Sequence, residues 1–451
     1  MRLHNNIFFA LVAVLSSATI GVEAKPLTLA ECREMAIESN LTLKSSIESV
    51  DISKDLLASY RSNHLPNLSL NANYLYSTTT LSQSIEGGYL PTLDISTGAM
   101  IPNQYAYMPD MNFDFEVGSI YNVGAMVVQP IYIGGKVSSA VKLAEIGVSV
   151  SQSRRQLTEA EVIVATDEAF YTLLKVEEMV TTAHKYQEVV EEFYRQTKNA
   201  QEAGMCRLYE VMKVEVRLNE AKLMCQRAEN GRRLAKMNLC YAIGLPLATL
   251  DLEVQDEFEL GRSVDSSNLD ITGRPEYRML EQQIEAKELE VKLTRSDYLP
   301  SISAIANYGY TGGAKLNNQT LFNSANFTGG VMVSVPIFNW GEGRRKSSAQ
   351  RREVTIAQNQ FEDLSQQMTL ELMQAINNYD EATMEVLLNE RSVRQAEENM
   401  RLSGEHYGAG MESIADYLEA QMLWQEAMNR LVEARGAQRI AFSLYEKAAG
   451  Y

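Results

Sequence analysis

The sequence has few histidines, no long apolar run beyond its first residues and less basic than acidic charge. Its four histidines, His4, His64, His184 and His406, are widely separated, and none has the spacing of a metal-binding pair. Acidic residues number 58 and basic residues 41, which argues against a nucleic-acid partner. After residue 24 no run of about 18 apolar residues occurs, so the sequence offers no transmembrane helix. We therefore expect no enzyme, no metal and no cofactor.

Residues 1–24 have the features of a secretory signal peptide. Arg2 precedes an uncharged apolar stretch, 7–22, and Val22-Glu23-Ala24 resembles a cleavage site with small residues. The alternative, a membrane anchor, has less support because the apolar stretch is short.

The four cysteines are expected to be free thiols. Cys206, Cys225 and Cys240 fall on one predicted helix, where a rise of about 1.5 Å per residue separates neighbours by roughly 22–28 Å. That separation is far beyond the reach of a disulfide. Cys32 lies too far from the apolar stretch to be a lipid-anchor cysteine.

The sequence contains an internal duplication. YRSNHLPNLSLNANYLY (60–76) matches TRSDYLPSISAIANYGY (294–310), VGAMVVQPIY (123–132) matches GGVMVSVPIF (329–338), and EAGMCRLYEVMK (202–213) matches GAGMESIADYLE (408–419). The first pair is 234 positions apart and the other two pairs are 206 apart, so the connection after the first strand is longer in the first half. We expect two related halves, 25–243 and 274–451, joined by a connecting segment, 244–273.

Each half has two segments in which apolar and polar residues alternate, the pattern of β-strands. The apolar positions are Leu68, Leu70, Ala72, Tyr74, Tyr76, Val123, Ala125 and Val127 in the first half, and Ile302, Ala304, Ala306, Tyr308, Tyr310, Val331, Val333 and Val335 in the second. The segments fit a soluble β-sandwich or a transmembrane β-barrel. Tyrosines near the strand ends favour the barrel, because aromatic residues girdle membrane barrels.

The rest of the chain has the pattern of helices. Residues 136–203 contain one glycine and repeat apolar residues at helical spacing. Shorter helices are expected from Thr28, which opens a capping box with Glu31, to about residue 60, and from Pro275 to about residue 295. Four prolines are expected where strands meet helices, because proline ends a helix or a ladder: Pro66, Pro130, Pro300 and Pro336.

Four strands are too few to close a membrane barrel, since the smallest such barrels have about eight. An open sheet would leave unpaired edges in lipid, at a cost of several kcal/mol per unpaired group. Copies of the chain must therefore share a barrel. Two copies give eight strands and three give twelve, and a transport role favours the wider lumen of twelve.

The order of these motifs resembles that of the TolC-type outer membrane efflux protein family. The resemblance covers nearly all of the chain after the leader and rests on LTLAECREMAIESN (27–40), the LP-strand segments (65–76, 299–310), the PIY and PIF segments (130–135, 336–341), NLCYAIGLPL (238–247), GRPEYRMLE (273–281) and YGAGMESIADYLEAQ (407–421). It implies an α+β membrane protein in the outer membrane of a Gram-negative bacterium. A homotrimer would share a twelve-stranded β-barrel, four strands per chain, continued by a long α-helical periplasmic barrel.

The resemblance also implies a function. The chain would be a passive exit duct for multidrug efflux or type I secretion, working with a periplasmic adaptor (membrane fusion) protein and an inner-membrane pump of RND or ABC type. Its other partner would be outer membrane lipid. Two alternatives stay open: a periplasmic coiled-coil adaptor or structural scaffold, which leaves the amphipathic strands unexplained, and a hydrolase or metal enzyme, for which the sequence has no catalytic constellation.

The resemblance places a gate at the periplasmic tip, with Asp416 and Glu419 as the pore constriction. The second acidic residue is commonly aspartate in the family. The residues that would brace the closed gate are Tyr407, Gly410, Glu412, Gly204, Arg207, Tyr209, Glu210 and Lys213. Glu412 stands where a basic residue is often found, so a basic partner is expected from the first half, from Arg207 or Lys213. The alternative for the two acidic residues is a solvated helix face.

The connection 77–122 is expected to face the cell exterior. Its aromatic residues, Tyr89, Tyr105, Tyr107, Phe113 and Phe115, would fold over the mouth or bind a partner. Asp114 and Glu116 alternatively extend the second strand toward the lumen.

Overall fold

The computed structural model of the chain describes residues 26–116, 119–249, 251–255, 264, 269–313, 315–317, 319–320 and 323–450. The chain divides into two compact units. The first comprises Met1–Asp51, Val150–Glu281 and Asn359–Tyr451, and the second Ile52–Ser149 and Gln282–Gln358. The predicted signal peptide, 1–24, lies outside the described residues, as does part of the predicted connection 244–273. Within the described ranges, no helix combines the length and apolarity needed to cross a membrane.

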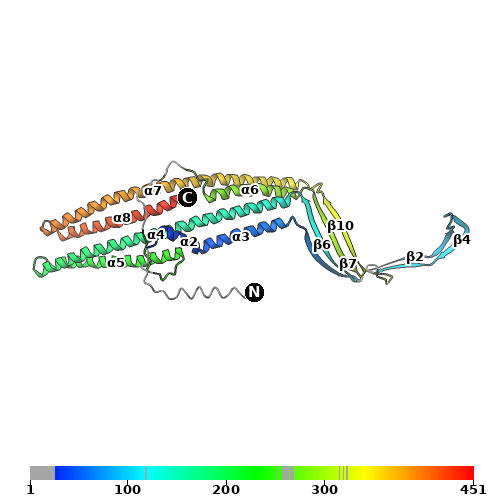
Figure 1. Cartoon of the computed structure of the whole chain (residues 1–451), viewed down its shortest axis with the longest axis horizontal. Helices are drawn as coiled ribbons and strands as arrows, with labels where there is room; N and C mark the ends of the chain where they lie inside the picture. The colour runs from blue at the N-terminus through cyan, green and yellow to red at the C-terminus, as the bar shows by residue number, and fades with distance from the viewer. Residues whose placement is uncertain are drawn as a thin grey trace. The chain divides into compact units, whose positions relative to one another are not determined.

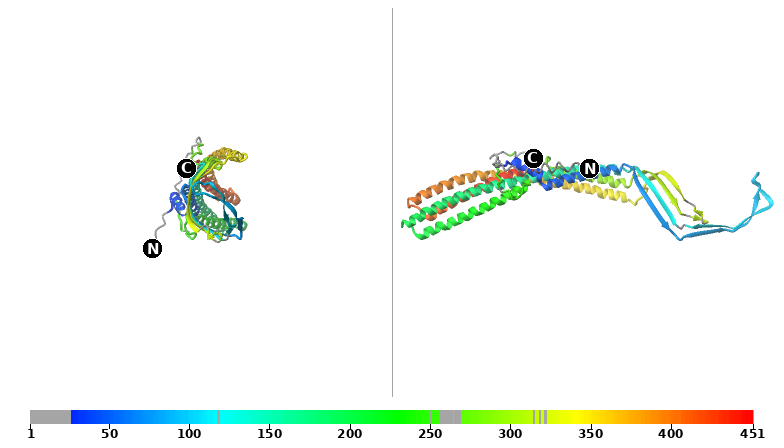
Figure 2. Two further views of the ribbon diagram at one scale, coloured as in Figure 1. Left: turned by 90° about the vertical axis from the view of Figure 1, so that its right-hand side faces the viewer. Right: turned by 60° about the horizontal axis from the view of Figure 1, so that its bottom comes forward.

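Two pairs of helices with equal lengths repeat along the chain. Helices α4 (Lys136–Glu202) and α7 (Glu342–Gly408) have 67 residues each, and α5 (Leu208–Ile243) and α8 (Ile414–Ala449) have 36 each. In both halves the shorter helix runs back alongside the longer one (Figures 1 and 2). Equivalent helix ends are 206 positions apart, the offset of the duplicated sequence, so the predicted duplication is confirmed.

The helix predicted from Thr28 to about residue 60 is two helices, α2 (Leu29–Ser39) and α3 (Leu41–Ser62). Asn40 separates them in an extended conformation, and its Oδ1 accepts hydrogen bonds from the amides of Thr42 at 2.8 Å and Leu43 at 3.1 Å. Asparagine competes with the helical backbone in this way, so it ends one helix and caps the next. The other short helix, α6 (Pro275–Ser296), has the predicted bounds.

The largest apolar core of the helical unit packs α2 against α4 and α5 around fully buried residues such as Cys32, Phe170 and Leu239. Beside this core, Arg33 forms a bidentate ion pair with Asp167, whose side chain is only 1% exposed. The two hydrogen bonds measure 2.7 and 2.6 Å. Arg33 also lies 3.6 Å from the carboxylate of Glu446. One guanidinium thus joins α2, α4 and α8.

All four cysteines are free thiols, as predicted. The prediction that Cys206 lies on a helix with Cys225 and Cys240 is wrong. Cys206 precedes α5, in the turn that follows α4, and its Sγ donates to the carbonyl of Thr197 at 3.3 Å. Helix α4 ends just before Gly204, which has a positive φ, and α5 begins only at Leu208, so the interval from Cys206 to Cys225 is not wholly helical.

Cys32 is expected to make the protein sensitive to alkaline pH. Burial, aided by the nearby carboxylates of Glu31 and Asp167, raises the pKa of its thiol from about 9 to about 11. The folded state therefore favours the neutral thiol, and this contribution to stability is present below pH 9 and is lost between pH 9 and 11. Thermal midpoints followed over this window should fall more steeply for the parent than for Cys32→Ala. Equal slopes would contradict the assignment.

The second unit contains an antiparallel sheet in the order β1 (Asn67–Tyr76), β6 (Ser119–Ile133), β7 (Ser301–Gly312), β10 (Asn323–Ser334). Its register brings the alternating apolar residues into rows that cross all four strands. One such row is Leu70, Ala125, Tyr308 and Phe327, and the next is Ala72, Val123, Tyr310 and Ala325. The four predicted strands and their shared apolar face are therefore confirmed.

Three of the four singled-out prolines stand at junctions between helices and strands. Pro66 lies between α3 and β1, Pro300 between α6 and β7, and Pro336 between β10 and α7. The prediction for Pro130 is wrong, because this residue lies inside β6, at a shift of register between Pro130 and Tyr132. Proline lacks the amide hydrogen of a regular ladder, so it is tolerated where the ladder is irregular.

The predicted connection 77–122 contains four further strands: β2 (Thr80–Ile85), β3 (Gly88–Leu93), β4 (Met100–Met108) and β5 (Met111–Glu116). β2 pairs with β5, which also pairs with β8 (Lys315–Leu316), and β8 pairs with β9 (Gln319–Thr320). β3 and β4 form a separate hairpin. We call β2 to β5 the arm.

Candidate gate at the helical turns

Two tight turns join the long helices, with a left-handed glycine in each. Gly204, between α4 and α5, has φ +76°, and Gly410, between α7 and α8, has φ +72°. The next amide donates back into the preceding helix in both turns, Met205 to Ala200 at 2.8 Å and Met411 to His406 at 2.9 Å. A helix that ends on left-handed glycine closes in this way. The duplicated sequence therefore encodes the same turn twice.

Alanine at either turn glycine is expected to destabilise the protein by about 1 kcal/mol, because an L-residue resists positive φ. A Cβ at Gly204 or Gly410 would meet no atom within 4 Å, so the cost is confined to the backbone. Gly147 of α4 is the matched control, since its Cβ would also have open space and alanine favours a helix. Thermal midpoints should fall for Gly204→Ala and Gly410→Ala and rise for Gly147→Ala. A neutral Gly410→Ala would count against strain at this turn.

Asp416 caps the helix that follows the second turn. Its carboxylate accepts hydrogen bonds from the amide of Ser413 at 3.2 Å and from the Ser413 hydroxyl at 2.6 Å, while its own amide donates to Ser413 Oγ at 3.3 Å. This capping role was missed in the sequence, although the Ser-x-x-Asp spacing is its signal. In the first turn Arg207 and Glu210 occupy the equivalent positions, and the Arg207 amide donates to Glu210 Oε2 at 2.9 Å.

Asp416 and Glu419 are exposed and lie three residues apart, on the same side of α8. The expected pairing of either carboxylate with Arg207 or Lys213 is not seen among the described residues of one chain. Lys213 instead lies over the ring of Tyr209, with Nζ 5.4 Å from the ring centroid. The Tyr209 hydroxyl donates to Glu210 Oε1 at 3.3 Å. The first-half residues thus interact with one another.

Glu412 is half-buried, and its Oε2 is buried without a hydrogen-bond partner. The buried hydroxyl of Ser403 in α7 also lacks a partner. At the equivalent places of the first half, Cys206 donates to the carbonyl of Thr197, and the Thr197 hydroxyl donates to the carbonyl of Phe193 at 2.8 Å. The two turns have the same backbone conformation, but buried polar side chains are hydrogen-bonded at the first turn and unpaired at the second. An unpaired buried polar group costs about 1–3 kcal/mol.

Three aromatic rings hold the two turns together. Tyr407 of α7 stacks on Tyr417 of α8, with centroids 5.8 Å apart, and Phe193 of α4 meets both rings edge-on at 5.4 and 4.8 Å. Val214, Ile414 and Leu418 complete this cluster. Burial raises the pKa of the Tyr407 hydroxyl. Tyr407, one of the predicted bracing residues, belongs to this cluster, whereas Phe193 and Tyr417 were not singled out in the sequence.

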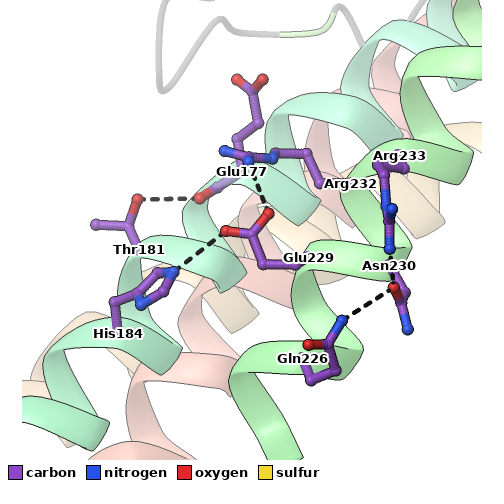
Figure 3. Close-up of polar contacts among 8 residues, drawn as sticks. All are labelled: Glu177, Thr181, His184, Gln226, Glu229, Asn230, Arg232 and Arg233. Carbon is purple, nitrogen blue, oxygen red and sulfur yellow. Dashed lines mark hydrogen bonds and ion pairs between the residues drawn. The ribbon is translucent and has the colours of Figure 1, made fainter. Parts of the chain in front are cut away.

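A set of polar side chains, farther from the turn, links α4 to α5 (Figure 3). His184 Nε2 lies 3.2 Å from Glu229 Oε1, and Arg232 binds the other oxygen of Glu229 at 2.6 Å. Gln226 and Asn230 continue this row on α5. These side chains are partly exposed, so their ion pairs add little stability. No set of three His, Cys, Asp or Glu side chains suited to a metal occurs in the described ranges.

Comparison with known sequences identifies related proteins. Residues 33–245 and 269–450 match the family described as outer membrane efflux protein. The alkaline protease secretion protein AprF of Pseudomonas aeruginosa is 21% identical over 294 residues, covering 63% of this chain and 60% of AprF. The probable efflux pump outer membrane protein TtgC of Pseudomonas putida is 22% identical over 329 residues, covering 70% of this chain and 66% of TtgC. The matches span less than two thirds of these relatives.

Solved structures share the fold over most of the chain. The outer-membrane channel OprN superposes with a TM-score of 0.74 at 15% identity, over 94% of this chain and 89% of OprN. The CmeC outer membrane channel of Campylobacter jejuni gives 0.72 at 18% identity, over 94% of this chain and 85% of CmeC. The predicted α+β channel fold is thereby confirmed.

Proposed function

This chain belongs to the outer membrane efflux protein family, and from that premise we propose that it is the outer membrane channel of a tripartite export system. The observation that carries the proposal is one chain that combines an amphipathic four-stranded sheet with a duplicated pair of 67-residue helices. The sheet suits the outer membrane of a Gram-negative bacterium, and the long helices suit a tunnel across the periplasm.

The barrel would be shared by three copies. Within the described chain, β1 and β10 are the edges of the sheet, and each pairs on one side only. Lipid does not tolerate such edges, so β10 of one copy would pair with β1 of the next. The row of Leu70, Tyr308 and Phe327 is strongly exposed in the single chain and would face the acyl chains. Twelve strands would enclose a lumen wide enough for transport.

The duct would be passive and depend on partners for energy. A periplasmic adaptor and an inner-membrane pump, of RND or ABC type, would dock at the helical turns. The names of the two curated relatives, a protease secretion protein and an efflux pump component, indicate different cargoes. We infer that the pump selects the cargo and that this chain supplies the exit.

We also propose that Asp416 and Glu419 form the gate. In a trimer, symmetry would bring six carboxylates around one axis, where they repel one another and attract cations. The aromatic cluster of Tyr407, Tyr417 and Phe193 would hold the hairpins in the closed arrangement. Because Glu412 replaces an expected basic residue, the interactions that hold the gate closed would differ from those of relatives.

Membrane fractionation followed by planar-bilayer recording tests the proposed function. The protein should stay in the outer membrane fraction after a high-salt wash, be released by detergent and give discrete cation-selective conductance steps. A periplasmic adaptor or scaffold, the alternative function, would be released by salt alone. Detergent-extracted protein without conductance would contradict the channel itself.

A further inference from the structure

The arm has one apolar and one polar face. The register of β5 against β2 places five apolar residues on one side: Leu81, Ile85, Met111, Phe113 and Phe115. Leu316 of β8, paired with Phe115, extends that side beyond the arm. Gln83 is the polar exception on that side. The opposite side carries Ser82 paired with Asp114 and Ser84 paired with Asn112. An antiparallel sheet with such a division commonly packs its apolar face against apolar groups and leaves its polar face in water.

Among the described residues, most of this apolar side is left uncovered, although Phe115 and Leu316 are half-buried. Leu81 is 64% exposed, and Ile85, Met111 and Phe113 are exposed as well. The β3–β4 hairpin adds three exposed tyrosines: Tyr89 and Tyr107 meet edge-on with centroids 5.4 Å apart, and Tyr105 lies opposite Pro91. Soluble surfaces rarely expose apolar patches of this kind unless a partner or a membrane contacts them.

The sequence continues the apolar face of the arm into the apolar face of the barrel sheet. Odd-numbered residues are apolar in β5 (Met111, Phe113 and Phe115) and also in β6 (Tyr121, Val123 and Ala125). In the second half the apolar residues are even-numbered, both in β7 (Tyr308 and Tyr310) and in β8 (Leu316). Since Val123 and Tyr310 are paired on the face proposed to contact lipid, the arm presents the same chemistry on the same strand parity.

A second copy of the arm is one group that could cover this apolar face, but the charge of the arm argues against it. From residue 65 to residue 135 the sequence has no Lys, Arg or His, and it has five acidic residues, Glu86, Asp94, Asp110, Asp114 and Glu116. Three such arms packed together would repel one another without compensating cations. The two edge strands of this sheet are β2 and β9, and β9 has only two residues. If β9 of a neighbouring copy paired with β2, it would therefore cover little of that strand.

We propose that the arm is an amphipathic ribbon that lies on the outer leaflet of the membrane, with its apolar face toward the acyl chains. The proposal rests on the proposed channel function, which places the sheet in the outer membrane. Asn112, Asp114 and Ser82 would face water, and the tyrosines of the β3–β4 hairpin would sit at headgroup level, where aromatic side chains concentrate. The arm would thereby fix the mouth of the channel to the membrane surface.

Single tryptophan substitutions in the full-length protein test this placement. Phe113→Trp reports on the apolar face, Asn112→Trp on the polar face of the same strand, and Leu70→Trp on the barrel face. Each variant would be reconstituted in phosphatidylcholine vesicles with brominated acyl chains, which quench tryptophan on contact. The emission of the parent, which contains Trp340 and Trp424, would be subtracted.

We expect Phe113→Trp to show blue-shifted emission and a loss of intensity in brominated lipid comparable with that of Leu70→Trp. Asn112→Trp should be quenched by aqueous acrylamide instead. Phe113→Trp shielded from both quenchers would mean a protein partner or a second copy, and Phe113→Trp quenched by acrylamide would mean an uncovered face; either result overturns the proposal. If Leu70→Trp also escapes brominated lipid, the barrel itself is contradicted.

Discussion

Replacing Asp416 and Glu419 together with alanine is expected to raise the single-channel conductance and to weaken block by a multivalent cation such as hexaamminecobalt. The six carboxylates of a trimer would both narrow the constriction and attract cations into it. Alanine is smaller and uncharged, so the double substitution would widen the passage and lower the affinity of the blocker. We expect the blocking concentration to rise roughly tenfold, which corresponds to about 1.4 kcal/mol. Recording in planar bilayers measures both quantities.

The capping role of Asp416 requires a control that separates charge from helix capping. Ser413→Ala removes the hydroxyl that bonds to Asp416 but leaves every carboxylate in place. It should lower stability by about 1 kcal/mol, as the loss of an N-cap does, and leave cation block unchanged. If Ser413→Ala weakened block as much as the double alanine variant, or if the double variant left block unaltered, the acidic gate would be refuted.

Arg33→Met is expected to destabilise the protein by about 3 kcal/mol, because it leaves the buried carboxylate of Asp167 without the guanidinium that binds it at 2.7 and 2.6 Å. Unfolding followed by circular dichroism in urea should show the lower midpoint. The double variant Arg33→Met/Asp167→Ala should recover part of the loss, since no charge is then left unpaired in the core.

Glu446→Gln provides the matched control for that ion pair. Its carboxylate lies 3.6 Å from Arg33 and both side chains are partly exposed, so its removal should change the midpoint little. A double variant no more stable than Arg33→Met would show that packing of the arginine stem, and not the stranded charge of Asp167, accounts for the loss.

Much of the fold was predictable because its signals are repeated. The alternation around Leu70 and Tyr308, the 206-residue offset and the glycines of the two turns each occur twice, so each half checks the other. The break at Asn40 was missed because the apolar spacing runs through it, while a single side-chain oxygen decides the local conformation. The arm was missed because Pro91 and Pro102 interrupt its strand pattern, and pairing between distant strands overrides such local signals.

The candidate gate was predictable only in part. The positions of Gly204, Gly410 and Tyr407 follow from the duplication and from the family resemblance. The partners of the charged residues do not, because they depend on which helix faces which. One chain leaves Lys213 on Tyr209 and Asp416 on Ser413, and the gate role of Asp416 stays a prediction about the assembled trimer.

Native mass measurement in mild detergent tests the central claim, that three copies share one barrel, most directly. The open edges β1 and β10 predict a single species with three times the mass of one chain. A monomer or a dimer as the largest stable species would contradict the shared twelve-stranded barrel, since four strands cannot close a barrel and eight leave little lumen.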